Sequence, residues 1–386
     1  MICSKTFGNL LKSAKNGGLC PLSLVWYYWV YWFSWKLAAL LRHSSTLFFN
    51  PVILNKKTLH IVVLGVANIG VILLVLEVGL RIYSSFVPLY DLEMHKYAIE
   101  LKRESTIPGL SHEHIPNSQA ELMGVDFKIN SLGFRDSEIS TNKEDDEYRI
   151  MTLGCSNGVG WGVPIDSVFT ELLESSLNRE QNKLRYSVVN AGVGNYNTVM
   201  EHLQLKQKFS PVDPDMVIVH YYINDAEIVE HYNPGFMVQH SYLAALMHNR
   251  SQYSDFQKQH AELGDYYAAL YEENAQGWKD AQSAILSIRK ICSSAAIPLL
   301  FVLQPDLHNV SEDSKQAKCH DIISKFLDNS NIEYLDLLPA FGTAFGSEPQ
   351  KAWVSSQDPH PNIAGHQLIY KKLYNYLQTR HSVDVN

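Results

Sequence analysis

The stretch YRIMTLGCSNGVGWGVP, from Tyr148 to Pro164, joins an apolar run to a turn rich in glycine. The run has the length and composition of a buried β-strand. The turn begins at Gly154 and brings Cys155 and Ser156 to the end of that strand. A turn this tight usually presents a backbone group or a side chain to another molecule or to another segment of the chain. Ser156 is the candidate, and a serine nucleophile requires a base from elsewhere in the chain.

Apolar strands and helices alternate in the chain after residue 147. The predicted strands are short continuous apolar runs, at 148–154, 186–192, 215–223, 297–303 and 332–337. The predicted helices, with apolar residues at helical spacing, are at 166–180, 198–209, 239–291, 313–328 and 362–378. Such alternation indicates βαβ units and a parallel sheet covered on both faces. With right-handed crossovers, the expected fold is a flavodoxin-like α/β fold, a three-layer αβα sandwich with a central parallel five-stranded sheet.

Composition and charge narrow the function classes. The chain has 386 residues, 46% of them hydrophobic, and a formal net charge of −8, so it can bury a large core and lacks the basic balance of a nucleic-acid-binding protein. Its five cysteines are scattered and form neither a disulfide framework nor a metal-binding pair. No His or carboxylate cluster has the spacing of metal ligands. The glycines at 158, 160 and 162 do not make a phosphate loop, because no Gly-Lys-Ser/Thr sequence follows them. We therefore expect no metal and no cofactor.

One apolar segment is long enough to cross a bilayer. Residues 59–76, LHIVVLGVANIGVILLVL, contain no charged residue apart from His60, and the run continues to Tyr83. About twenty apolar residues span a membrane, and a helix buried in a globular core would show a polar stripe. We predict a transmembrane helix at 59–83. Lys56 and Lys57 precede it, so the positive-inside rule places the rest of the chain on the extracytoplasmic (periplasmic or extracellular) side of the cell membrane.

The predicted span also sets the boundaries of the other parts of the chain. An N-terminal region, 1–58, contains the aromatic segment LSLVWYYWVYWFSWKLAALL at 22–41, which is interpreted either as a second span or as an interfacial helix. Residues 84–147 are interpreted as a linker and small lead-in segment ending in the acidic run NKEDDE, which we expect to be solvated. The αβα domain is predicted at 148–380, with a helical insertion at about 230–290.

Polar residues follow the predicted strands at the points where the strands end. Ser156 follows the first strand, the loop 190–198 (NAGVGNYNT) the second, and Asn224 the third; Asp358 and His360 precede the last helix. Sites in parallel sheets form at the carboxyl ends of the strands. A serine activated by a histidine, a carboxylate that orients the histidine, and amide donors for an oxyanion are the groups that acyl transfer requires.

The order and spacing of these blocks resemble the SGNH (GDSL) hydrolase superfamily, over about Asn130 to Leu377. NSLGFRD at 130–136 and LEVGLRIY at 76–83 resemble segments of a membrane-anchored bacterial branch of it. The resemblance agrees with the α/β fold inferred from the alternation. It implies a serine hydrolase that acts on esters.

The resemblance also implies roles for individual residues. Ser156 would be the nucleophile, His360 its base and then acid, and Asp358 the group that orients His360. The oxyanion would be held by the N–H groups of Ser156 and Asn195 and by the side-chain amide of Asn224.

The blocks depart from the family pattern at three positions. Cys155 stands where the family has Asp, and Asn195 and Tyr222 stand where it has glycine. Asparagine tolerates a positive φ, so Asn195 can still direct its N–H inward, whereas Tyr222 would narrow the pocket. We expect Gly194, Tyr222 and Asn157 to contact the substrate.

Other roles for these residues stay open. Ser156 could cap a helix, and His360 could be a plain loop histidine. Cys155 is a rival nucleophile, although adjacent residues point apart and a buried apolar cysteine is its expected state. Asp225 is a rival to Asp358 as the acid; Asp358 is favoured because only two positions separate it from His360.

We therefore predict a membrane-anchored, extracytoplasmic serine esterase acting on O-acetyl groups of cell-surface glycans. The substrate class is inferred from the predicted membrane anchor, the tight first loop and the substrates that are common in the family. Three alternatives remain: an O-acyltransferase of the same fold, a lipid acyl hydrolase in which 230–290 forms a lid or groove, and a catalytically silent glycan-binding or assembly protein. The expected partners are an acylated small molecule or glycan and the membrane, and no nucleic acid.

Overall fold

The computed structural model describes residues 55–179, 184–229, 234–259 and 262–384. By its internal contacts the chain divides into two units, residues 1–83 and 84–386. The predicted aromatic segment at 22–41 lies outside the described residues.

The described part of the first unit is the helix α3 (Lys56–Ser84), which includes the predicted span at 59–83. Its most apolar window has a mean hydropathy of 2.7. At 1.5 Å per residue, its 29 residues exceed the roughly 30 Å of a bilayer's hydrocarbon core. Within the described ranges it is the one helix long and apolar enough to cross a membrane, by length and composition.

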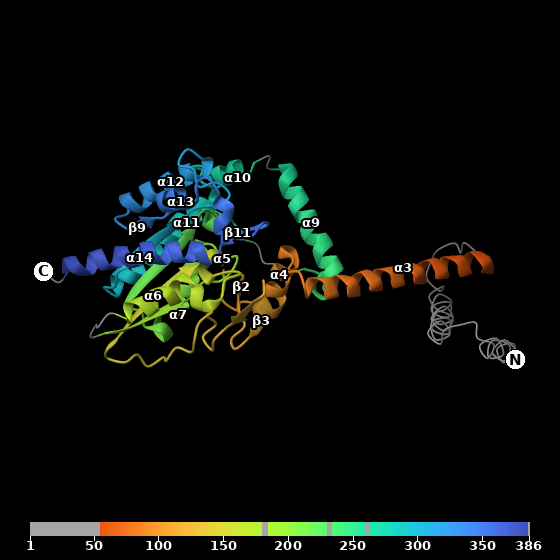
Figure 1. The fold of residues 1–386 in the computed structure, drawn as a ribbon, viewed down its shortest axis with the longest axis horizontal. Coiled ribbons are helices and arrows are strands. Elements are labelled where there is room, and N and C mark those ends of the chain that lie inside the picture. Colours follow the sequence, from red (N-terminus) through yellow and green to blue (C-terminus); the bar gives the residue numbers. More distant parts are fainter. Residues whose placement is uncertain (1–54, 180–183, 230–233, 260–261, 385–386) are drawn as a thin grey trace. The chain divides into compact units, whose positions relative to one another are not determined.

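The second unit is built on a five-stranded parallel sheet (Figure 1). Its strands are β5 (Glu147–Gly154), β6 (Arg185–Asn190), β7 (Met216–Tyr222), β8 (Leu299–Gln304) and β9 (Glu333–Asp336). They lie in the order β6-β5-β7-β8-β9, and each predicted strand is present with its ends within two residues. The predicted sheet is confirmed.

Helices cover both faces of this sheet, which confirms the predicted three layers. One face packs against α7 (Thr198–Val212), α10 (Leu263–Leu270), α11 (Gln276–Ser294) and α12 (Lys315–Asn329). The other packs against α6 (Phe169–Leu177), α13 (Leu338–Phe345) and α14 (Ile363–Asp384). Because both faces are buried, the strands are continuous apolar runs instead of alternating ones.

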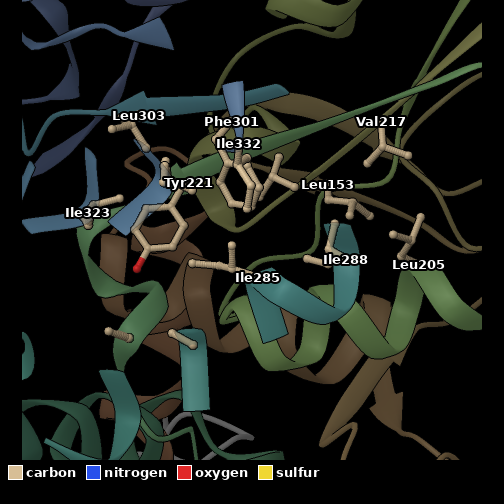
Figure 2. Close-up of a cluster of buried hydrophobic side chains, with 14 of the residues drawn as sticks. Leu153, Leu205, Val217, Tyr221, Ile285, Ile288, Phe301, Leu303, Ile323 and Ile332 are labelled. Atoms are coloured by element: carbon tan, nitrogen blue, oxygen red, sulfur yellow. The ribbon is translucent and has the colours of Figure 1, made fainter. Parts of the chain in front are cut away.

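The first of these interfaces is a closely packed apolar core. Figure 2 shows Val217 and Phe301 from the sheet together with Ile285 and Ile288 of α11, and all four side chains are fully buried. Burying a side chain of this size contributes about 1.5–3 kcal/mol. The core therefore holds the strand ends, and the residues that follow them, in fixed positions.

Residues 84–147, interpreted from the sequence as a linker and small lead-in segment, form a folded segment in the same unit. It contains α4 (Tyr90–Lys96), the π-helix η1 (Tyr97–Leu101), and the strands β1 (Lys102–Glu104), β2 (His112–His114), β3 (Gln119–Leu122) and β4 (Val125–Lys128). The acidic run NKEDDE is not solvated throughout. Its last residue, Glu147, is buried in β5 and pairs with Arg149 and Arg185.

The predicted insertion is helical. It contains α8 (Phe236–His240) and α9 (Tyr242–Gln259), followed by α10 and α11 of the sandwich. Arg250 of α9 pairs with Asp91 of α4 at 2.8 Å, so the insertion contacts the lead-in segment. Near the C-terminus, the antiparallel strands β10 (Trp353–Ser355) and β11 (Asp358–Pro361) form a hairpin that the sequence did not predict.

Candidate active site

Ser156 is the first residue of the short helix α5 (Ser156–Val159), directly after β5. Cys155 between them is extended, so the chain turns from strand to helix within one residue. Gly160 ends the helix with φ at +79°, a left-handed conformation that costs glycine little. Ser156 is half buried at the carboxyl end of a central strand.

His360 of β11 faces this serine. Its Nε2 lies 2.8 Å from Ser156 Oγ, although 204 positions separate the two residues. Its Nδ1 lies 2.5 Å from Asp358 Oδ1. Positions i and i+2 of a strand point to the same side, so a separation of two places the carboxylate beside the imidazole. The expected proximity of the hydroxyl and the imidazole is confirmed.

The Asp358 carboxylate is fully buried and hydrogen-bonded on both oxygens. Trp161 Nε1–H donates to Oδ2 at 2.8 Å, and the His360 backbone N–H donates to Oδ1 at 3.1 Å. Burial acts to raise the pKa of Asp358, but the His360 imidazole and these hydrogen bonds outweigh it and hold the pKa below its usual value. Asp358 is therefore a carboxylate at neutral pH, and its Oδ1 can accept a hydrogen bond from His360 Nδ1.

Cys155 is fully buried, as expected for an apolar cysteine. Burial, and then the charge of Asp225, raises the pKa of its thiol well above the usual value, so the thiolate is disfavoured. Asn157 is buried too and directs its amide toward the Cys155 sulfur at 3.9 Å. The side chain of Asn157 thus faces the protein interior, and its contact with the substrate stays a prediction.

The loop after β6 packs directly on α5. At Gly192, a Cβ atom would lie 2.5 Å from the backbone nitrogen of Val159, so only glycine permits this approach. Asn195 is exposed in the same loop and has φ at +68°, the positive value that the sequence predicted.

Gly194 is buried, and its backbone is engaged by the lead-in segment. Its N–H donates to Tyr97 Oη at 2.8 Å. Its carbonyl accepts from His112 Nε2 at 3.0 Å and from Lys102 Nζ at 3.3 Å. Gly194 therefore anchors the loop, with both of its backbone groups engaged within the protein, and its contact with a substrate stays a prediction. The three anchoring side chains were missed because no local pattern links them to residues ninety positions away.

A further buried side chain of the lead-in segment, that of Arg135, holds the glycine-rich loop. Arg135 is 1% exposed, and its guanidinium donates to the carbonyls of Val159, Gly160 and Val163 at 2.5–3.1 Å. The loop that carries Trp161 is thereby fixed on both sides. The lead-in segment is thus part of the site's framework.

Asn224 lies in the 3-10 turn η3 (Ile223–Ala226) after β7 and is half buried. Asp225, the rival acid, is buried and accepts the backbone N–H of Tyr222 at 2.9 Å. The carboxylate that contacts His360 is Asp358. The Tyr222 hydroxyl donates to Asp306 at 3.1 Å, so it is occupied within the protein instead of being free for a substrate.

A pocket of about 770 Å³ adjoins these residues. It is lined by the lead-in segment, by α8 and α9, and by Asn195. Tyr90, at the start of α4, also lines it, and its ring centroid lies 6.4 Å from that of His360. Sequence reasoning missed both Tyr90 and the pocket. In the part of the chain that the structure describes, no group of three or more His, Cys, Asp or Glu could hold a metal ion.

Several solved structures are similar in fold to the chain, whereas no family model and no curated protein sequence matches it. A two-domain esterase active on acetylated mannans is 14% identical, with a TM-score of 0.39, over 60% of this chain and 49% of that one. The esterase EstA from Pseudoalteromonas sp. is 14% identical, with a TM-score of 0.39, over 61% and 98%. An acetyl xylan esterase is 15% identical, with a TM-score of 0.37, over 59% and 98%.

The chain thus spans about half the length of the two-domain esterase. Structural similarity at this level is not evidence of activity. The function therefore has to be inferred from the side chains of the site. The α/β fold that the resemblance to SGNH hydrolases implied, with a central parallel five-stranded sheet, is the fold that the structure has.

Proposed function

We propose that the protein is a serine esterase. The observation that carries this proposal is the continuous hydrogen-bonded line from Ser156 Oγ through both nitrogens of His360 to Asp358, with distances of 2.8 and 2.5 Å. This is the arrangement that converts a weak hydroxyl nucleophile into an effective one.

The reaction follows from these positions. As Ser156 Oγ attacks the ester carbonyl, its proton passes to His360 Nε2, and Asp358 stabilises the imidazolium that forms. When the tetrahedral intermediate collapses, His360 returns the proton to the departing alcohol and an acyl-serine remains. Water then attacks the acyl-serine with His360 again as base, which releases the carboxylic acid and restores the serine.

The oxyanion of the tetrahedral intermediate needs hydrogen-bond donors. We assign them to the backbone N–H groups of Ser156 and Asn195 and the side-chain amide of Asn224. The positive φ of Asn195 and the anchored loop around it support this assignment. Losing one such donor typically costs about 3–4 kcal/mol of barrier.

The proposed substrates are O-acetyl esters of cell-surface glycans, and the proposed location is the cell membrane, with the site on the extracytoplasmic side. The long apolar helix α3 supports anchoring. Its two preceding lysines support the orientation through the positive-inside rule.

A serine-reactive fluorophosphonate probe tests the proposal. We expect the full chain to be labelled covalently and to hydrolyse p-nitrophenyl acetate. The labelling and the hydrolysis should both vanish in Ser156→Ala and persist in Cys155→Ala. Labelling that survives in Ser156→Ala but is lost in Cys155→Ala would identify Cys155 as the nucleophile instead of Ser156. A wild-type chain without labelling or turnover would refute the esterase function.

A further inference from the structure

We propose that the pocket beside His360 is a sugar-binding site, which holds the neutral sugar units of an O-acetylated oligosaccharide and presents one acetyl ester to Ser156. This inference rests on the proposed esterase function and adds to it the class of group that binds next to the reacting ester.

The pocket lies next to the reacting groups, and two of its lining residues are Tyr90 and Asn195. Tyr90 contributes to its wall and lies against the His360 ring, with an angle of 32° between the two ring planes. Asn195, the proposed oxyanion donor, lines it as well. A substrate whose carbonyl lies at Ser156 would therefore extend toward the pocket past Tyr90 and Asn195.

The lining combines polar groups with apolar surface, which suits an amphipathic ligand such as a sugar. Ten of the fifteen lining residues are polar or charged. The aliphatic ones are Met94, Ala98, Ile99 and Pro234. A hydrocarbon chain would desolvate the polar groups without replacing their hydrogen bonds, which is costly. A sugar offers hydroxyl groups that both donate and accept, and an apolar ring face that can stack on an aromatic side chain such as Tyr90.

The charges of the pocket are compensated within the protein. Asp91 pairs with Arg250 at 2.8 Å, and Arg103 pairs with Glu113 at 2.7 Å. The Lys102 amine donates to a backbone carbonyl, and burial lowers its pKa to about 7. Acidic and basic side chains are thus both present in the lining, and two of them, Asp91 and Arg103, are already paired within the protein. A neutral sugar fits this balance.

The size of the pocket fits a group larger than acetate. Its volume of about 770 Å³ lies within the range of small-molecule sites. An acetyl group would leave most of it unfilled, so the remainder is available for the alcohol side of the ester. Contacts to such non-reacting units can raise kcat/KM for the full substrate above that for a minimal ester.

The test is to fill the pocket with a bulky side chain and compare two kinds of ester. Ile99 lines the pocket, and its matched control is Ile322 on α12, outside the lining; both isoleucines are 37% exposed. We expect Ile99→Trp to lower kcat/KM for chemically acetylated xylo- and manno-oligosaccharides by about tenfold or more, and to leave p-nitrophenyl acetate within about twofold. Ile322→Trp should alter neither.

Three results would overturn the sugar site. The first is an Ile99→Trp variant that behaves like Ile322→Trp on the oligosaccharides. The second is equal kcat/KM for acetylated mono-, di- and trisaccharides in the wild-type chain. The third is a preference for p-nitrophenyl decanoate over the acetate that Ile99→Trp removes, because the pocket would then hold an acyl chain.

Calorimetry separates a failure of this inference from a failure of the esterase function. The full-length Ser156→Ala chain should bind non-acetylated xylo- or manno-oligosaccharides, and the additional Ile99→Trp substitution should weaken that binding. Such binding without any turnover in the wild-type chain would support the sugar site and refute the esterase. Turnover of aryl acetates without binding of either oligosaccharide would refute the sugar site alone.

Discussion

Trp161 and Asp358 are joined by a hydrogen bond of 2.8 Å from the indole Nε1–H to the carboxylate Oδ2, across 197 positions of sequence. The tryptophan belongs to the glycine-rich loop after Ser156, and the aspartate belongs to the hairpin that carries His360. This bond ties the loop of the proposed nucleophile to the proposed acid. It also fixes which Asp358 oxygen faces the imidazole.

Trp161→Phe should lower kcat for p-nitrophenyl acetate by about tenfold, because Asp358 loses a charge-assisted hydrogen bond that orients it. Trp353→Phe is the matched control, since its indole N–H donates to the Leu307 carbonyl at 2.9 Å instead of to a carboxylate. Steady-state kinetics and thermal melts of both variants are the measurement. Equal losses of kcat in the two variants would show that the hydrogen bond from Trp161 contributes no more to catalysis than the one from Trp353.

Asp358→Asn should lower kcat by about 10⁴-fold, as expected when the group that sets the imidazole tautomer is lost. The chain offers a second Asp-x-His pair as the control: Asp306 Oδ1 lies 2.8 Å from His308 Nδ1. Asp306→Asn should keep kcat within about threefold, because activity depends on the serine beside His360 and not on the pairing itself. A comparable loss in both variants would contradict the assignment of the acid.

Tyr97→Phe should lower kcat by about tenfold with little change in KM, because the loop that carries Asn195 loses its anchor at Gly194. Tyr221→Phe is the control. Its hydroxyl is also buried and lies 2.9 Å from that of Tyr271. We expect similar decreases in Tm for both variants and a decrease in kcat for Tyr97→Phe alone. If kcat falls only in step with Tm, the role of Tyr97 is structural.

Glu201 of α7 links stability to pH. It is fully buried, and neither carboxylate oxygen has a hydrogen-bond partner among the described residues. Burial raises its pKa to about 8, against about 4.3 in an unfolded chain. Between these values the folded chain keeps a proton that the unfolded chain has lost, so the free energy of unfolding falls as pH rises toward 8 and levels off above it.

We therefore expect Tm to decrease between about pH 6 and about pH 8.5, and Glu201→Gln to reduce that slope. Some slope should remain, because burial and then the Glu201 charge also raise the pKa of Asp225. Glu272→Gln, at an exposed position, should keep the wild-type slope. Scanning calorimetry across this range is the measurement, and parallel curves for Glu201→Gln and the wild-type chain would contradict the prediction.

The sequence by itself determined the layers of the fold and the positions of Ser156, Asp358 and His360. Hydrophobic periodicity is a local property, so the strands could be predicted to within two residues. The ends of parallel strands meet at one edge, so residues that follow different strands could be expected to converge. A separation of two positions was enough to favour this aspartate as the partner of the histidine, although the strand that carries both was not predicted.

Only the tertiary structure decided which way the neighbouring groups face. Asn157 and Gly194 adjoin the site in sequence, yet they are turned toward Cys155 and Tyr97. The bond from Trp161 to Asp358 and the pocket beside Tyr90 depend on packing between segments that lie far apart in the chain. Such contacts leave no periodic or local signal, because side-chain direction is set by the space that the folded neighbours leave.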